Sequence, residues 1–236
     1  MTLQHLLSYM RRACDDYHMI APGDKIAVGV SGGKDSLTTL AGMAAMRRFH
    51  QSSYTLTAIT VDLGFPGFDT APVREYCDKL EVPYTVVPTD IADIVFNICK
   101  ENNPCALCAK MRKGALNDAA IRSGVTKVAY GHNRDDLIHT FFLSLFYEGR
   151  MHTCEPVTYL SRTNLHCIRP LMYVPETDVI GFVKKYGLPV TKSPCPVDGS
   201  TKREEIKQMV HSMRLAYDHF DEKVFGAIKR RLIDTI

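Results

Sequence analysis

Residues 25–36, KIAVGVSGGKDS, decide the expected fold. The first half of this stretch, residues 25–30, is a short apolar run that indicates a buried strand, and Ser-Gly-Gly ends it. The second half leads into a predicted helix over residues 35–49. Two glycines allow a tight turn whose successive N–H groups face one anion, and the helix adds its positive end. The stretch therefore predicts a phosphate-binding loop between a strand and a helix.

Lys34 and Asp35 distinguish this loop from a Walker A loop. That pattern has Gly six residues before its Lys and Ser or Thr after it, whereas this chain has Val28 and Asp35 there. A carboxylate beside phosphates is repulsive unless Mg²⁺ or a proton lies between them, so Asp35 is a candidate Mg²⁺ ligand. A glycine turn with a solvated Lys-Asp pair is the alternative interpretation.

Outward from this loop, strand and helix patterns alternate, which predicts βαβ units on a parallel sheet and an α/β fold. The expected strands cover residues 25–30, 54–61, 84–87, 127–130, 157–160 and 166–169. The expected helices cover residues 3–19, 35–49, 69–80, 91–100, 105–123, 135–147 and 176–186, with two polar helices across 201–236. No repeat or linker is visible. We therefore expect one domain over residues 1–236, with an N-terminal helix over 1–20 and a C-terminal helical tail over 200–236.

The composition is that of a globular protein and excludes a disordered, a collagen-like and a coiled-coil protein. The 236 residues are 45% hydrophobic and 23% charged, with a formal net charge of +3. No apolar run approaches the roughly 18 residues that indicate a membrane span, and the N-terminus lacks the apolar core of a signal peptide. We therefore expect a cytoplasmic protein with no membrane partner, and the sequence leaves a homodimer open.

Residues 131–136, GHNRDD, follow the strand predicted over residues 127–130. Asp135 and Asp136 begin a predicted helix, where carboxylates favourably meet the helix dipole, so capping alone could explain them. Asp136 could instead hold Mg²⁺ near the phosphates or manage a proton. His132 follows a strand, where open α/β sheets place ligands, and a structural histidine is the alternative.

Eight cysteines without a signal peptide indicate thiols rather than disulfides. Cys105 and Cys108 form a CxxC at a predicted helix start, which could be a thioredoxin-like redox pair, a zinc site, an iron–sulfur site or two buried thiols. The second CxxC that a structural zinc site usually has is absent. Cys195 lies between two prolines in an expected loop, which suits an exposed metal ligand. The remaining cysteines are expected to be structural: Cys14, Cys77, Cys99, Cys154 and Cys167.

A basic stripe follows the CxxC. Residues 109–127 contain Asp118 as their one carboxylate and the cations Lys110, Arg112, Lys113, Arg122 and Lys127. A solvated helix face would explain most of them. Arg112 lies four residues after Cys108, on the same side of the helix, and could hold a phosphate of ATP or of RNA.

The loop SGGKDS resembles the pyrophosphatase loop of the N-type ATP pyrophosphatases. The resemblance implies a five-stranded parallel sheet flanked by helices, an adenine nucleotide alpha-hydrolase-like and Rossmann-like fold, in which the loop holds ATP while its α-phosphate is attacked. The ATP contacts that it implies are Val30, Ser31, Gly32, Gly33, Lys34, Asp35, Ser36, Asp62, Gly131, His132 and Asp136. It implies Asp35 as the Mg²⁺ ligand.

Four features together resemble the TtcA-like family, the tRNA 2-thiocytidine synthetases, over roughly residues 20–215. They are CxLCxxxRxGxL, GHxxDD, Arg169-Pro170-Leu171 with Tyr173-Val174-Pro175-Glu176, and a late Cys. The resemblance implies a 4Fe-4S cluster on three thiolates and catalytic side chains. The cluster ligands would be Cys105, Cys108 and Cys195, and the catalytic residues Asp35, Asp136 and Arg112.

The implied reaction converts a cytidine, at tRNA position 32, to 2-thiocytidine through an adenylated intermediate, with ATP, Mg²⁺ and sulfur from sulfide or a cysteine desulfurase persulfide. One departure concerns the late cysteine, because family members often have a second CxxC there and this chain has Asp198 three residues after Cys195. Three other functions stay open. They are ATP-dependent sulfur transfer or ligation on another RNA position or a small molecule, lysidine-synthetase-like amidation, and a non-catalytic iron–sulfur or zinc module that binds adenylates.

Overall fold

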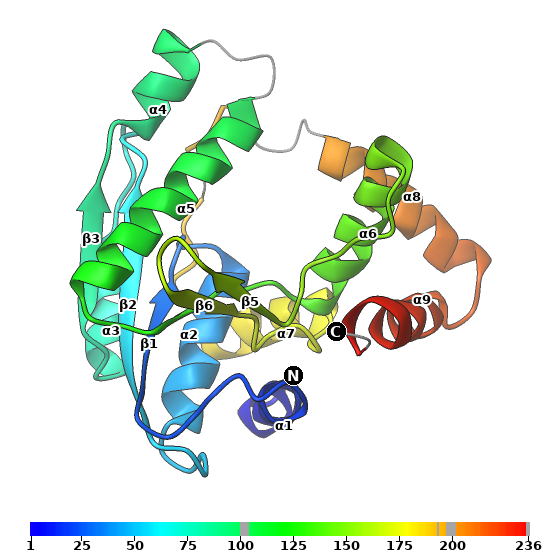
Figure 1. Cartoon of the computed structure of the whole chain (residues 1–236), viewed down its shortest axis with the longest axis horizontal. Helices are drawn as coiled ribbons and strands as arrows, with labels where there is room; N and C mark the ends of the chain where they lie inside the picture. Colours follow the sequence, from blue (N-terminus) through cyan, green and yellow to red (C-terminus); the bar gives the residue numbers. More distant parts are fainter. Residues whose placement is uncertain (100–103, 193, 197–201, 235–236) are drawn as a thin grey trace.

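The computed structural model describes residues 1–99, 104–192, 194–196 and 202–234. In this part of the chain a six-stranded sheet forms the centre, in the order β3-β2-β1-β4-β6-β5 (Figure 1). The strands are β1 (Asp24–Gly29), β2 (Tyr54–Asp62), β3 (Tyr84–Pro88), β4 (Lys127–Ala129), β5 (Val157–Leu160) and β6 (Leu165–Ile168). All pairs are parallel except β5 with β6. The α/β class is confirmed, and the six strands match the six strand patterns of the sequence. The sheet has one more strand than the five that the family resemblance implies, because β5 adds an antiparallel edge.

The helices follow the expected pattern with shifted ends. They are α1 (Leu3–Asp16), α2 (Lys34–Met46), α3 (Ala71–Lys79), α4 (Ile91–Asp93), α5 (Pro104–Arg122), α6 (Arg134–Glu148), α7 (Glu176–Tyr186), α8 (Lys202–Ala216) and α9 (Phe220–Ile228), with π-helical turns η1 (Ile94–Ile98) and η2 (Lys229–Ile233). The first helix stops at Asp16, earlier than expected, and His18 after it has a left-handed φ of 48°. The expected tail is helical over residues 202–216 and 220–233, with a turn between them, while residues 200, 201, 235 and 236 lie outside the described ranges.

Two apolar layers cover the two faces of the sheet. Ile26 and Val28 of β1 point into the larger layer, with side chains of α1, α2 and α7. Ala27, between them, points into the smaller layer with Leu116 and Ala119 of α5. The alternation follows from the two-residue period of a strand, and it sandwiches the sheet between helices on both sides.

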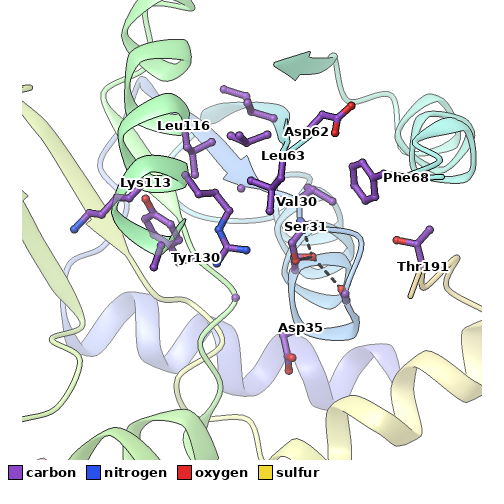
Figure 2. A pocket seen from close by; sticks show the side chains of 18 of the residues that line it. Val30, Ser31, Asp35, Asp62, Leu63, Phe68, Lys113, Leu116, Tyr130 and Thr191 are labelled. Carbon is purple, nitrogen blue, oxygen red and sulfur yellow. Dashed lines mark hydrogen bonds between the residues drawn. The ribbon is translucent and has the colours of Figure 1, made fainter. Parts of the chain in front are cut away.

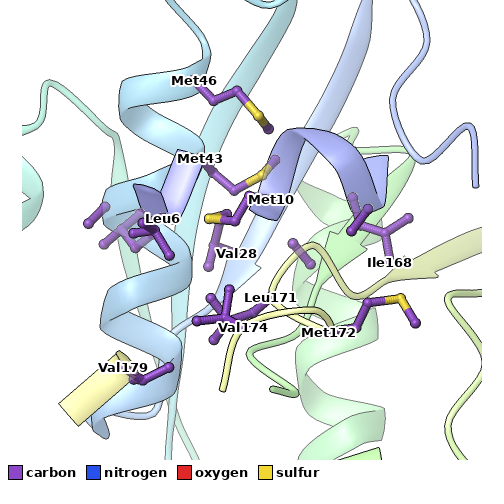
Figure 3. Close-up of a cluster of buried hydrophobic side chains, with 14 of the residues drawn as sticks. Leu6, Met10, Val28, Met43, Met46, Ile168, Leu171, Met172, Val174 and Val179 are labelled. Atoms are coloured by element: carbon purple, nitrogen blue, oxygen red, sulfur yellow. The ribbon is translucent and has the colours of Figure 1, made fainter. Parts of the chain in front are cut away.

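Helix α2 is buried along most of its length in the larger layer (Figure 3). Met10 of α1 meets Met43 of α2 in this layer. A Cβ atom on Gly42 would lie 2.2 Å from the Met10 sulfur, so the two helices approach closely because this residue is glycine. The burial fixes α2, and with it the loop that precedes α2, against the sheet.

The order of the strands places a crevice beside β1. The chain builds β2 and β3 on one side of β1 and then crosses to β4 and β6 on the other. Parallel α/β sheets bind ligands at such a switch point, at the carboxyl ends of the strands. The segments that follow β1 and β4, residues 30–36 and 130–136, both begin at this edge.

Helices α6, α8 and α9 pack on one another and lie beside the sheet in Figure 1. Asp135 of α6 ties them to the rest of the fold, since it pairs with Arg214 of α8 and accepts a hydrogen bond of 2.8 Å from the Glu176 backbone N–H of α7. At the other end, the Tyr173 hydroxyl donates to Asp16 at 2.7 Å, and Lys229 of η2 lies 3.2 Å from the same carboxylate. No helix in the described ranges combines the length and apolar character that crossing a membrane requires.

Candidate active site

A cavity of about 480 Å³ opens at the carboxyl ends of β1, β2 and β4, within the usual size range of small-molecule sites (Figure 2). Figure 2 shows Val30 and Ser31 near its centre, with Asp62 and Phe68 toward one side and Lys113 and Tyr130 toward the other. Of the predicted site residues, nine line it: Val30, Ser31, Gly33, Asp35, Ser36, Asp62, Arg112, Gly131 and His132.

The loop after β1 leaves the N-terminus of α2 open. The Ser31 backbone N–H donates to the Ser36 hydroxyl at 3.2 Å, and that hydroxyl donates to the Gly33 carbonyl at 2.9 Å. Gly33 is the N-cap of α2 and makes no side-chain capping hydrogen bond. Because the first N–H groups of a helix have no partner within the helix, this end is suited to bind an anion.

Gly32 is required where the segment after α7 crosses the loop. Its φ is +80°, and a Cβ atom there would lie 2.1 Å from the Thr191 hydroxyl oxygen. The Thr191 backbone N–H donates to the Gly32 carbonyl at 3.0 Å. The segment that carries Cys195 is therefore anchored to the phosphate-binding loop, a contact that nothing in the local sequence indicates.

Lys34 points to two carboxylates and is outside the cavity lining. Its ammonium lies 2.7 Å from Asp35 and 2.9 Å from Glu176 at the start of α7. Burial lowers the pKa of Lys34, but the two carboxylates outweigh this effect and raise the pKa overall. The lysine expected at a phosphate is thus engaged by Glu176, a partner that sequence reasoning missed.

Asp35 and Asp136 approach each other across the start of α6. Asn133 caps α6 through a reciprocal pair of hydrogen bonds with Asp136, and its side-chain amide donates to Asp35 at 2.8 Å. Burial, followed by the negative charge of Asp35, raises the pKa of Asp136 to about 6, against the opposing charge of Arg203. Two carboxylates beside an anion-binding helix end are the ligands that Mg²⁺ prefers when phosphate and water complete its shell.

Gly131 brings these two segments together. A Cβ atom there would lie 2.8 Å from the Asp35 carbonyl carbon and 2.9 Å from the Ser36 nitrogen. The backbone after β4 therefore packs directly on the first turn of α2. This close approach explains why a glycine precedes His132.

The end of the cavity next to the carboxyl end of β2 is mostly apolar and contains one carboxylate, that of Asp62. Asp62 ends β2 and accepts a 2.9 Å hydrogen bond from the Gly64 backbone N–H. Leu63, Phe65 and Phe68 follow in the same loop and line the cavity with it. Sequence analysis selected Asp62 and missed these three neighbours, because apolar residues in a loop do not differ from core residues in their local pattern. A flat, partly apolar group such as a nucleobase fits this end.

His132 is surrounded by positive charge. Burial lowers its pKa to about 3, and four cations act in the same direction: Arg169, Arg203, Arg112 and Lys113. His132 is therefore neutral at physiological pH.

The three predicted cluster ligands lie on α5 and on the segment after α7, close to the part of the cavity lined by Ala109 and Pro194. Cys105 is exposed and Cys108 and Cys195 are partly buried. Burial raises the pKa of Cys108, the Arg112 charge lowers it, and the thiols of Cys195 and Cys105 raise it. Cys105 and Cys195 thus each act electrostatically on Cys108. In the described ranges, however, no three Cys, His, Asp or Glu side chains are gathered closely enough to hold a metal ion.

The other cysteines divide between core and surface. Cys14, Cys77 and Cys167 are buried, which confirms their structural interpretation. Cys154 is partly buried, and Cys99 is exposed at the end of η1, so the core prediction is wrong for Cys99. Cys195 was expected to be exposed and is half-buried.

Comparison with known proteins shows which family the chain is similar to. The chain matches the PP-loop domain family over residues 5–213. It is 35% identical to a tRNA-cytidine(32) 2-sulfurtransferase of Teredinibacter turnerae over 96% of this chain and 76% of that protein. The corresponding protein of Aliivibrio salmonicida is 36% identical, over 92% of this chain and 72% of the relative.

Among solved structures, the U34-tRNA thiolase NcsA from Methanococcus maripaludis, determined with its 4Fe-4S cluster, superposes with a TM-score of 0.78 at 22% identity, covering 99% of this chain and 80% of NcsA. That likeness confirms the fold. By the family match and the identity to its relatives, the chain belongs to the PP-loop family and, within it, to the tRNA-cytidine(32) 2-sulfurtransferases.

Proposed function

We propose that this chain is an ATP-dependent thiolase that replaces O2 of cytidine 32 in a tRNA with sulfur. One observation carries the proposal: the loop after β1 and the first turns of α5 line the same cavity. Ser31 of the loop and Ala109, which directly follows Cys108, face one space. The shared space supports nucleotide activation next to thiol ligands. The name of the sulfurtransferase relatives supports tRNA cytidine as the substrate.

ATP would lie across the cavity from the helix end to the apolar end. Its phosphates would receive hydrogen bonds from the N–H groups at the start of α2 and from Ser31 and Ser36. Asp35, with Asp136, would hold Mg²⁺, which would remove the repulsion between these carboxylates and the phosphates. The adenine would pack beside Phe68.

The reaction would proceed in two displacements. O2 of the cytidine attacks the α-phosphorus of ATP, and pyrophosphate leaves with the electron pair of the broken P–O bond. Hydrosulfide then adds to C2 of the activated base, AMP departs with the former O2, and loss of the S–H proton leaves the 2-thio group. A persulfide donor would first be reduced by a second thiol, which forms a disulfide and releases that hydrosulfide. Arg112, on the cavity wall, would stabilise negative charge on the α-phosphate in both steps.

Cys105, Cys108 and Cys195 are proposed to hold a 4Fe-4S cluster. Thiolates are the ligands that such clusters use. Cys105 and Cys108 share the first turns of α5, and both Cys105 and Cys195 raise the pKa of Cys108, which supports placing the three in one site. When bound by three thiolates, a cluster supplies one iron with an open position for sulfur.

Pyrophosphate release by protein purified and reconstituted without oxygen tests the proposal. We expect release to require both ATP and a tRNA with cytidine at position 32, and Asp35→Asn to lower it more than about 100-fold. Asp118→Asn, on the exposed face of α5, is the matched control and should keep full activity. Equal turnover with an RNA-free metabolite extract would contradict tRNA as the substrate.

A further inference from the structure

One wall of the cavity carries positive charge without ion-pair partners. Arg112 and Lys113 of α5 are exposed and line the cavity together with His132. Arg169 follows β6, which pairs with β4, and its charge acts on His132 and on Tyr130. Within the described ranges, no carboxylate lies in salt-bridge distance of Arg112, Lys113 or Arg169.

The same wall contains two buried polar atoms without hydrogen-bond partners in the described structure, Nδ1 of His132 and Nε of Arg169, while the Tyr130 hydroxyl interacts with the Cys167 thiol. Buried donors and acceptors are nearly always satisfied, so two such atoms on one wall indicate a missing partner. The other end of the Arg169 side chain is held, since its Nη1 donates to the Thr158 hydroxyl at 3.1 Å and to the Glu155 carbonyl. Arg169 is therefore held in place through Nη1, while its Nε–H donor has no partner in the described structure.

A phosphate group is the partner that matches these observations. It needs several donors and positive charge, which Arg112, Lys113 and the neutral His132 ring offer from one side, with Arg169 behind them. The phosphates of ATP are proposed to bind at the start of α2, whose Gly33 and Ser36 line the same cavity, with Arg112 at the α-phosphate. Lys113 and Arg169 have no part in that proposed site and are left for a second phosphate. The exposed side chains of Arg112 and Lys113 also place the wall where a large ligand can reach it.

We propose that this wall, formed by Arg112, Lys113, His132 and Tyr130 with Arg169 behind it, binds one backbone phosphate of the RNA at the nucleotide that enters the cavity. The proposal rests on the proposed function. A base inside a folded anticodon arm must leave its stack to reach the cavity, and its own phosphate then lies next to the cavity wall. The wall would hold the displaced nucleotide by its phosphate, independently of the identity of its base.

The test is the salt dependence of binding between full-length protein and a tRNA anticodon stem-loop, measured by fluorescence anisotropy. We expect Lys113→Gln and Arg169→Gln each to weaken RNA binding about 5- to 10-fold and to reduce the slope of log K against log salt by about 0.7 to 0.9. The dissociation constant for a non-hydrolysable ATP analogue should stay within about twofold. Arg122→Gln, at the far end of α5, is the matched control and should change neither quantity.

Several outcomes would overturn the proposal. The Lys113 side chain is exposed, so Lys113→Gln should fold normally. If this variant keeps the wild-type RNA affinity and the wild-type slope of log K against log salt, the wall is excluded as an RNA site. An equal loss of affinity for the ATP analogue or for pyrophosphate would assign the wall to nucleotide phosphates. Failure of the wild-type protein to bind the stem-loop would refute the proposed function as well, whereas wild-type binding with unaffected variants refutes only this inference.

Discussion

Asp136→Asn should stabilise the protein in metal-free buffer while removing its activity. In the absence of a cation, burial and the nearby Asp35 raise the pKa of the Asp136 carboxyl from its ordinary value of 3.8 to about 6. A carboxyl that binds a proton more tightly in the folded state than in the unfolded state makes folding less favourable as pH rises between these two values. The cost reaches its full size above about pH 6.

The magnitude follows from the size of the pKa change. About two pH units, at roughly 1.4 kcal/mol each, give about 3 kcal/mol of unfavourable free energy in the ionised wild-type protein. The amide would also lose the 3.1 Å ion pair with Arg203, whose side chain is 43% exposed, at a cost of about 1 kcal/mol or less. The Asn133 backbone N–H keeps an acceptor in the variant. We therefore expect a net gain of about 2 kcal/mol at about pH 8 that vanishes near pH 4.

Urea unfolding at several pH values, with a chelator present, measures this gain. Asp135→Asn is the neighbouring control, because it removes the buried ion pair with Arg214 and should lower stability at neutral pH. Addition of Mg²⁺ with an ATP analogue should stabilise the wild type more than Asp136→Asn, since the cation restores the advantage of the carboxylate. An Asp136→Asn protein that is no more stable than wild type at pH 8 would refute the reasoning.

Two further changes test the loop and its surroundings. Glu176→Gln should free Lys34 to turn toward bound phosphate and so tighten the binding of an ATP analogue about two- to fivefold, as measured by calorimetry. The gain is small because an ion pair of this partial exposure is worth at most about 1 kcal/mol. Weaker binding in the variant would contradict a competition between Glu176 and phosphate for Lys34. Gly131→Ala should lower the unfolding free energy by about 2 kcal/mol or more and abolish ATP binding, because the new Cβ atom meets the backbone of α2. Gly114→Ala, in open space on α5, should instead raise stability by about 0.5 to 1 kcal/mol, and equal effects of the two substitutions would show that close packing at Gly131 is unimportant.

The features that sequence reasoning found are those encoded by neighbouring residues. Residues 25–36 contain the strand, the glycine turn and the helix start in one stretch, so their geometry is local and could be predicted. The pair Asn133 and Asp136 also had a local signal, a polar residue followed three positions later by an acid at a helix start. That signal could have identified Asn133 as the N-cap of α6, but not its hydrogen bond to Asp35, which lies 98 residues away in the sequence.

The features that were missed depend on contacts between distant segments. Glu176 reaches Lys34 from α7, and Thr191 reaches Gly32 from the segment beyond it, across more than a hundred residues of sequence. The wall around His132 likewise exists because β6 lies next to β4 and places Arg169 beside Tyr130. Thr191 has an unremarkable local pattern, and the motif that contains Arg169 and Glu176 carries the family resemblance without indicating these contacts. Only the order of the elements in space brings the residues together.

Nucleoside mass spectrometry of tRNA after incubation with the reconstituted protein, ATP, Mg²⁺ and sulfide tests the central claim most directly. We expect 2-thiocytidine, mapped to position 32, to form only when ATP is present. Cys195→Ser should lose this product together with its iron, whereas Cys154→Ser, which alters a cysteine outside the proposed ligand set, should keep both. Sulfur at another position, a product that forms without ATP, or full activity in Cys195→Ser would contradict the proposed thiolation on a three-cysteine cluster.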